Sequence, residues 1–123
     1  MRVNRSLTDP AVNLHELLVR VDNDYDLLRE LIVLFKDDFP DLMSALHRAV
    51  AESDLKTTQR ASHTLKGMCL TMAAARAVAA AARLEELART QDAGALPNAL
   101  KLLEGEMALL LPELELHLAK PES

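Results

Sequence analysis

The sequence predicts an all-α protein, an antiparallel four-helix bundle with a short N-terminal helix across one end. Half of the 123 residues are hydrophobic, with only three glycines and three aromatic residues. Leucine and alanine dominate, and both favour a helix over a strand. Apolar residues recur at three- and four-residue steps along several long segments. Four such segments with short connections are typical of an antiparallel bundle.

The chain length is suited to one domain with a single core, so we expect residues 1–123 to form one domain with the bundle at about 14–118. No apolar run approaches the ~20 residues that cross a bilayer. The start, M-R-V-N-R-S-L-T-D-P, lacks the apolar segment of a secretory signal. A lone cysteine, Cys69, rules out an internal disulfide and suits a reducing compartment. We therefore expect a cytoplasmic protein that does not enter a membrane.

The first two helices follow recognisable start signals. Asn13 and Glu16 are spaced as a capping box, which predicts a short helix from about Leu14 to Arg20. The run D-N-D then offers caps for a second helix. Pro40 must kink or interrupt that helix, because it has no N–H to donate to its fourth predecessor. The apolar positions of the second helix are Leu27, Leu28, Leu31, Leu34, Phe35, Phe39, Leu42, Leu46, Ala49 and Val50.

Asp54 opens a further helix from Leu55 to about Met72, and an alanine-rich stretch follows it to Arg89. As one helix this would span about 50 Å at ~1.5 Å per residue, too long for a compact domain of this size. We therefore expect a turn near Met72 to Ala74. After the loop T-Q-D-A-G-A, the last helix begins at Pro97 and should bend at Pro112.

The distribution of charge limits the partners. A net charge of −5 argues against nucleic acid, whose binding needs a basic face. The segment from Lys56 to Arg89 carries six basic residues against two acidic ones, so it is basic within an acidic chain. Two interpretations remain open: a solvated helix face, or a basic surface for a small anionic target.

Within that segment, A-S-H-T-L-K-G places a histidine on the outer face of its helix. With Leu65 at the centre of the buried stripe, His63 lies ~200° away and points outward, while Ser62 lies at the stripe's edge in a structural role. An exposed imidazole is largely neutral near pH 7 and can act as a nucleophile. Lys66, one turn on, can place a cation beside an anion on the ring. Gly67 costs the helix ~1 kcal/mol relative to alanine, and we expect its lack of a side chain to leave the ring uncrowded.

The same outward face carries Gln59, Arg60 and Leu70, which we take as candidate contacts for a partner. A single outward histidine is usually an ordinary surface residue. The combination H-x-x-K-G on one outward face instead favours a functional site.

The sequence resembles the histidine-containing phosphotransfer (HPt) domains of two-component phosphorelays. The family motif is similar to H-x-L-K-G with a downstream L-E, and the similarity extends upstream to L-L-R-E-L-I-V-L-F-K-D-D-F-P-D-L, spanning about 14–118. Ala73 stands where the family usually has glycine, and residues 68–70 are bulkier than is common. The matching motif residues are His63, Thr64, Leu65, Lys66, Gly67, Leu84 and Glu85.

The resemblance implies a function and a set of partners. His63 would accept a phosphoryl group from the phosphoaspartate of a receiver domain and pass it to another receiver, with Lys66 steadying the group and Gly67 giving the partner access. The partners would be receiver domains of a hybrid histidine kinase or a response regulator, bound by a monomer. This chain would bind no cofactor, and Mg²⁺ would belong to the receiver. The alternative is a helical adaptor that binds a regulator or kinase without carrying phosphate.

Other chemistry has weaker support. With three glycines there is no phosphate-binding loop. None of the four histidines has glutamate three residues before it, which disfavours a di-iron bundle and leaves no predicted metal site. Cys69 is expected to be a packed thiol. The remaining histidines are expected to be ordinary surface or edge residues, and most methionines core residues: His15, His47, His117, Met43, Met68, Met72 and Met107.

Overall fold

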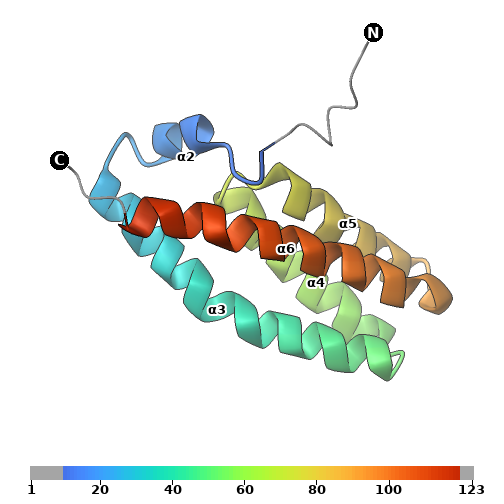
Figure 1. The fold of residues 1–123 in the computed structure, drawn as a ribbon. Coiled ribbons are helices and arrows are strands. Elements are labelled where there is room, and N and C mark those ends of the chain that lie inside the picture. The colour runs from blue at the N-terminus through green and yellow to red at the C-terminus, as the bar shows by residue number, and fades with distance from the viewer. Residues whose placement is uncertain (1–9, 120–123) are drawn as a thin grey trace, which may run out of the picture.

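The computed structural model describes residues 10–119, and this part of the chain is helical with no strand. Its elements, in chain order (Figure 1), are α2 (Leu14–Arg20), α3 (Tyr25–Ala51), α4 (Leu55–Thr71), α5 (Ala75–Arg89), the 3₁₀ turn η1 (Ala93–Ala95) and α6 (Leu96–Ala119).

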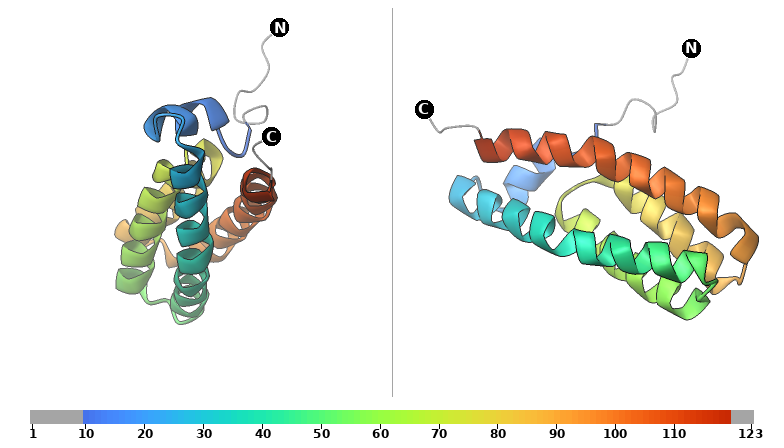
Figure 2. Two further views of the ribbon diagram at one scale, coloured as in Figure 1. Left: turned by 90° about the vertical axis from the view of Figure 1, so that its left-hand side faces the viewer. Right: turned by 60° about the horizontal axis from the view of Figure 1, so that its bottom comes forward.

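The four long helices form an antiparallel bundle. Within the bundle, α3 packs beside α4 and α6, and α5 packs beside the same two helices. The helices α4 and α6 therefore lie diagonally opposite each other. The short α2 crosses one end of the bundle, as the two views of Figure 2 show. The predicted fold class is therefore confirmed, including the helix across one end.

Polar side chains begin the first three helices. Asn13, Asp24 and Asp54 each accept a hydrogen bond from the backbone N–H three residues on, at 3.0, 3.0 and 3.1 Å. Each satisfies a donor that the first turn of a helix leaves unpaired. The predicted bounds of α2 agree with the structure, and Asp54 starts α4 as expected.

The ends of α2, α3, α4 and α5 share one arrangement, in which a residue just past the helix adopts a positive φ. After α4, Ala73 has φ 55°, its N–H donates to the carbonyl of Leu70, and the N–H of Ala74 donates to that of Cys69. This pair of bonds defines a Schellman motif. It confirms the predicted turn at Met72 to Ala74. No glycine has a positive φ; the residues that do are Asp22, Asn23, Ser53, Ala73 and Gln91.

The two internal prolines do not end their helices. We expected Pro40 to kink or interrupt its helix, and interruption is wrong, because α3 continues through it from Tyr25 to Ala51. The last helix, α6, also continues through Pro112. The kink at Pro40 and the bend at Pro112 stay predictions. Both prolines are exposed. Water can therefore bond the backbone carbonyls that lack a donor, so the helix need not stop.

The predicted stripe of α4 forms part of the core. Leu65 and Cys69 are fully buried, as are the two polar residues Thr58 and Ser62. Ser62, expected at the edge of the stripe, is instead completely enclosed, and its hydroxyl donates to the carbonyl of Thr58 at 2.6 Å, as predicted for a structural serine. The side of α5 that faces α4 is rich in alanine, so these two helices make the most extensive contact in the bundle, with Ala61, Ala73, Ala74, Ala77, Ala81 and Ala88 buried.

Replacing an exposed left-handed residue by glycine should stabilise the protein. Gln91 is exposed, with φ 64°. A left-handed conformation costs an L-residue ~1–2 kcal/mol, which glycine avoids. The greater entropy of glycine in the unfolded state offsets part of this gain. We therefore expect Gln91→Gly to add about 0.5–1 kcal/mol to the free energy of unfolding. Urea denaturation measures it. The neighbouring Thr90→Gly, at φ −89°, should destabilise instead, and equal effects at the two positions would contradict this explanation.

Candidate functional site

His63 lies on the outer face of α4, where the side chain is 66% exposed. Ser62, the residue before it in the sequence, faces the core and is completely buried. The helical geometry that puts Leu65 in the core therefore directs the imidazole into solvent, as the sequence predicted.

One carboxylate from the next helix joins His63 and Lys66. Glu85 on α5 contacts Nδ1 of His63 through Oε2 at 2.9 Å, and it contacts Nζ of Lys66 through Oε1 at 2.8 Å. Only 18% of the Glu85 side chain is exposed, so the carboxylate sits in the groove between α4 and α5. The ring is therefore held through one nitrogen, and Nε2 has no hydrogen-bond partner within residues 10–119.

The charge of Glu85 fixes the tautomer of the ring. Desolvation acts to raise the pKa of Glu85, but hydrogen bonds from Lys66 and His63 together outweigh it, so the pKa of Glu85 is lowered. An ionised carboxylate can only accept hydrogen bonds. Nδ1 must therefore carry a proton, and in the neutral imidazole the lone pair is on Nε2. The exposed nitrogen is the nucleophilic one.

The positive charge near the ring is arranged differently from our expectation. We expected the Lys66 ammonium to be free to stabilise an anion on the ring, but it is already paired with Glu85. Lys56 and Arg60, which line one surface hollow with His63, have no ion pair among the described residues. These two side chains make this part of α4 positive, although both interact electrostatically with Asp54 at the start of the helix. They favour the interpretation of the basic segment as a surface for an anionic partner.

Gly67 is exposed on α4, one turn after His63. A Cβ built on Gly67 would meet no heavy atom within 4 Å. We expected that a side chain at this position would crowd the ring. For a side chain as small as a methyl group this expectation is wrong, because the space around Gly67 is open. Nothing in the described part of the chain requires a glycine at this position.

The three candidate partner contacts are divided between two hollows. Gln59 and Arg60 line the same shallow hollow as His63 and Glu85. Leu70, which is 49% exposed, lies two turns further along α4 and lines a separate hollow with α2 and α5. The structure therefore places two of the three beside the histidine.

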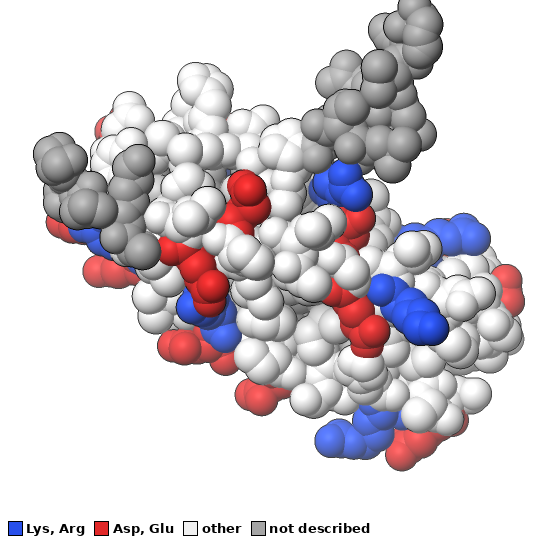
Figure 3. Space-filling view, in the orientation of Figure 1, with Lys and Arg blue, Asp and Glu red and all other residues white. Residues whose placement is uncertain are grey.

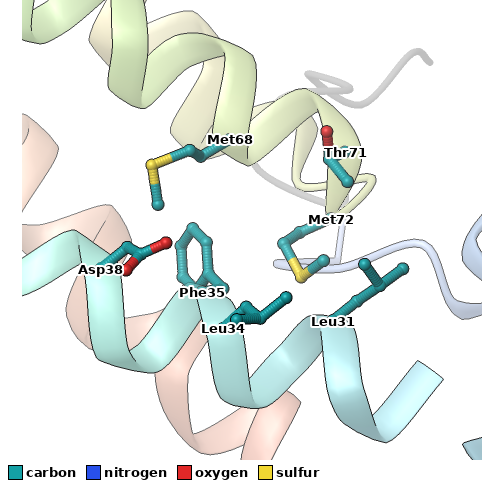
Figure 4. A pocket seen from close by; sticks show the side chains of 7 residues that line it. All are labelled: Leu31, Leu34, Phe35, Asp38, Met68, Thr71 and Met72. Carbon is teal, nitrogen blue, oxygen red and sulfur yellow. The ribbon is translucent and has the colours of Figure 1, made fainter. Parts of the chain in front are cut away.

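An apolar cleft of about 130 Å³ opens on the other side of α4, between this helix and α3. Figure 4 shows Met68 and Met72 extending from α4 toward Phe35 and Leu31 of α3, with Asp38 at one end. Met72 is buried as expected, whereas Met68 is only half-buried and lies one residue after Gly67. The cleft and the histidine thus lie on different sides of α4.

Other reactive side chains have ordinary surroundings. Burial raises the pKa of the Cys69 thiol to about 12, which makes it a packed thiol, as predicted, rather than a nucleophile. His47 is exposed and pairs with Glu104. Within the described residues, no three histidine, cysteine, aspartate or glutamate side chains gather as metal ligands.

Comparison with protein families identifies the chain. The family model of the Hpt domain matches residues 30–118, nearly three quarters of the sequence and all of the bundle from early α3 to the end of α6. The chain belongs to the Hpt domain family. It is a histidine phosphotransfer protein of the phosphorelay type.

A solved structure gives the same fold for this Hpt domain. It is similar to histidine-containing phosphotransfer protein B (HptB) from Pseudomonas aeruginosa PAO1, with a TM-score of 0.81 and 22% sequence identity over 87% of this chain and 93% of that one. Among curated proteins, none matches the chain significantly. In residues 10–119 of the Hpt domain, none of the helices has the length and apolarity needed to span a bilayer.

Sequence reasoning missed the bridging role of Glu85, although the L-E pair of the family motif was the available signal. It also missed Arg20 of α2, whose guanidinium donates to the carbonyl of Leu70 on α4. Both are contacts between helices, which the periodicity of a single helix does not report.

The lowered pKa of Glu85 predicts a specific acid sensitivity. Its contribution to stability should be complete above the ordinary carboxyl value of about 4.3 and should be lost as the pH falls through the lowered pKa. The free energy of unfolding of the wild type should therefore fall more than that of Glu85→Gln between pH 5 and pH 3. Urea denaturation across this range tests it, with Asp26→Asn, which removes the more exposed ion pair of Asp26 with Arg29, as control. Parallel curves for wild type and Glu85→Gln would refute the prediction.

Proposed function

We propose that His63 is the phosphoacceptor of this Hpt domain and that Nε2 is the atom phosphorylated. The observation that supports it best is the Glu85 contact, which holds the ring through Nδ1 and leaves the other nitrogen on an exposed face. A carboxylate that orients an imidazole in this way performs the same task as the acid that orients a catalytic histidine.

The transfer follows from this geometry. The Nε2 lone pair attacks the phosphorus of a phosphoaspartate on a receiver domain, the N–P bond forms, and the P–O bond to the aspartate breaks. The aspartate carboxylate leaves, and the ring, which keeps its Nδ1 proton, becomes cationic. Glu85 stabilises that cation at 2.9 Å. In the onward step the carboxylate of a second receiver takes the phosphoryl group, and the ring returns to the neutral tautomer.

Lys66 has a second role in this scheme. It is bound to Glu85 before transfer, and it lies one turn from His63 on the same helix. Once three phosphoryl oxygens stand on Nε2, the ammonium can turn from the carboxylate to them. Phosphoryl transfer depends mainly on positioning and on charge stabilisation, so a cation that moves this short way supports the group without forming a bond.

The partner would be a receiver domain of a hybrid histidine kinase or a response regulator. Lys56 and Arg60 beside the histidine complement an acidic receiver pocket, where Mg²⁺ would reside, and Gln59 is placed to contact the same partner. The apolar cleft at Met68 and the exposed Leu70 extend the contact in two directions. The encounter should be small, below about 1,200 Å² in total, because a relay must release each partner. We place it in the cytoplasm, where receiver domains act.

Replacing His63 should abolish the relay without unfolding the protein. When the wild type is incubated with a phosphorylated receiver, we expect label on this chain that is labile to acid and stable to base. His63→Gln should acquire none and should keep its circular dichroism spectrum, since the side chain is 66% exposed. His47→Gln is the matched control and should be labelled normally. Binding of the receiver without label on the wild type would instead favour an adaptor.

Gly67 should show opposite effects on stability and transfer. Since a Cβ there meets nothing within 4 Å, Gly67→Ala should raise the free energy of unfolding by ~1 kcal/mol, the helix-propensity difference. A larger side chain, Gly67→Gln, should keep most of that gain and slow transfer from the receiver at least about tenfold, because it fills space that the partner needs. Normal transfer by the Gln variant would remove the access role of Gly67.

A further inference from the structure

The outer face of α6 carries a row of exposed leucines that no part of the described chain covers. Leu102, Leu109 and Leu116 are 67%, 54% and 64% exposed. They are seven residues apart, so they form one stripe along the helix. In Figure 3, which faces α6, uncharged surface runs along this helix between two rows of charged side chains. Apolar patches of this kind usually mark a contact.

A glycine lies within the same stripe. Gly105 is exposed, and by helical spacing it falls between Leu102 and Leu109. A Cβ built on it would meet nothing within 4 Å. Glycine inside a helix costs ~1 kcal/mol relative to alanine, and nothing in the described fold requires it here. Because Gly105 has no side chain, it leaves a gap in this row of leucines, and we call this gap next to Leu109 the hollow.

We propose that this face binds a second copy of the chain, with the two α6 helices antiparallel across a two-fold axis. In an antiparallel pair of identical helices, a side chain at a heptad position near the axis packs against a residue of the facing helix. The number of that residue differs from its own by three or four. Leu109 of each copy then fills the hollow at Gly105 of the other. A two-fold axis requires that such pairs be reciprocal, and a leucine and a hollow on the same helix meet this requirement.

The charges beside the stripe fit the same register. Lys101 and Glu115 flank opposite ends of the stripe on one side of α6, so the antiparallel arrangement brings Lys101 of each copy to Glu115 of the other. Glu115 contacts Lys36 of its own chain at 2.7 Å but is 53% exposed. On the other side of the stripe, Glu106 would approach its copy across the axis. Its charge is already compensated by Arg76 at 2.9 Å, so little repulsion results.

The contact would leave the phosphoacceptor open. α6 is diagonal to α4 in the bundle, so His63 and the leucine stripe lie on different sides of the molecule. The stripe from residue 102 to 116 is only about 21 Å long at ~1.5 Å per residue. The interface is therefore at the small end of the range, and the dimer is reversible. The proposal differs from our expectation of a monomer, and the oligomeric state is what the experiment below decides.

Association can be measured by sedimentation equilibrium between about 10 μM and 1 mM, the range expected for a small interface. The wild type should change from monomer to dimer across it. Leu109→Glu should weaken association more than about tenfold, because it puts two carboxylates beside the axis. Val19→Glu is the matched control, since Val19 is 64% exposed on α2, and it should associate as the wild type does. A wild type that stays monomeric, or equal effects of the two variants, would overturn the proposal.

Further variants at Gly105, Lys101 and Glu115 separate the dimer from general effects on folding. Gly105→Gln should raise the thermal stability measured at 10 μM or below, yet weaken association at least about tenfold, because it fills the hollow that Leu109 of the second copy needs. Lys101→Glu and Glu115→Lys should each weaken association, and the double variant should regain it. Failure of the double variant to regain it, or tighter association of Gly105→Gln, would refute this register. Transfer to His63 should be unaffected throughout, so failure of the dimer is distinct from failure of the relay.

Discussion

The two hydrogen bonds of Glu85 organise the site. One carboxylate, largely enclosed between α4 and α5, accepts from the imidazole with one oxygen and from an ammonium with the other. This is possible because small side chains let the two helices approach closely, with Ala77 and Ala81 buried between them. The chemistry of the exposed ring, including which nitrogen bears the lone pair, thus depends on alanine packing on the neighbouring helix.

This arrangement also keeps the resting site electrically balanced. Placing an imidazole, an ammonium and a carboxylate together gives a cluster in which each charge has a partner before any phosphate arrives. A phosphorylated ring brings additional negative charge on its oxygens and a positive charge in the ring, and the same two side chains can meet both. In the proposed transfer to His63 the protein would therefore need no large rearrangement, which suits a carrier that must be loaded and unloaded repeatedly.

Much of this could be predicted from the sequence, for a physical reason. Periodicity within one helix determines which residues face the core, so the outward position of His63 and the burial of Leu65 and Cys69 followed from spacing alone. How far one helix is shifted along its axis relative to its neighbour depends on packing across the bundle. The bond from Glu85 to His63, which joins residues 22 apart, could not be obtained in that way. The sequence left open whether α3 would continue through Pro40 or stop there, since this depends on which side of the helix meets water.

The small helix α2 lies outside the range matched by the Hpt family model, which begins at residue 30. It is nevertheless joined to the last turn of α4: the Arg20 guanidinium donates to the carbonyl of Leu70, and the N–H of Asn13 donates to that of Ala73 at 2.9 Å. These carbonyls stand at the end of the helix that carries His63. A piece of the protein cut at the family boundary would lose this brace together with the first turn of α3 and the buried Leu17 and Leu28, so the packed unit of this chain extends beyond the recognised domain.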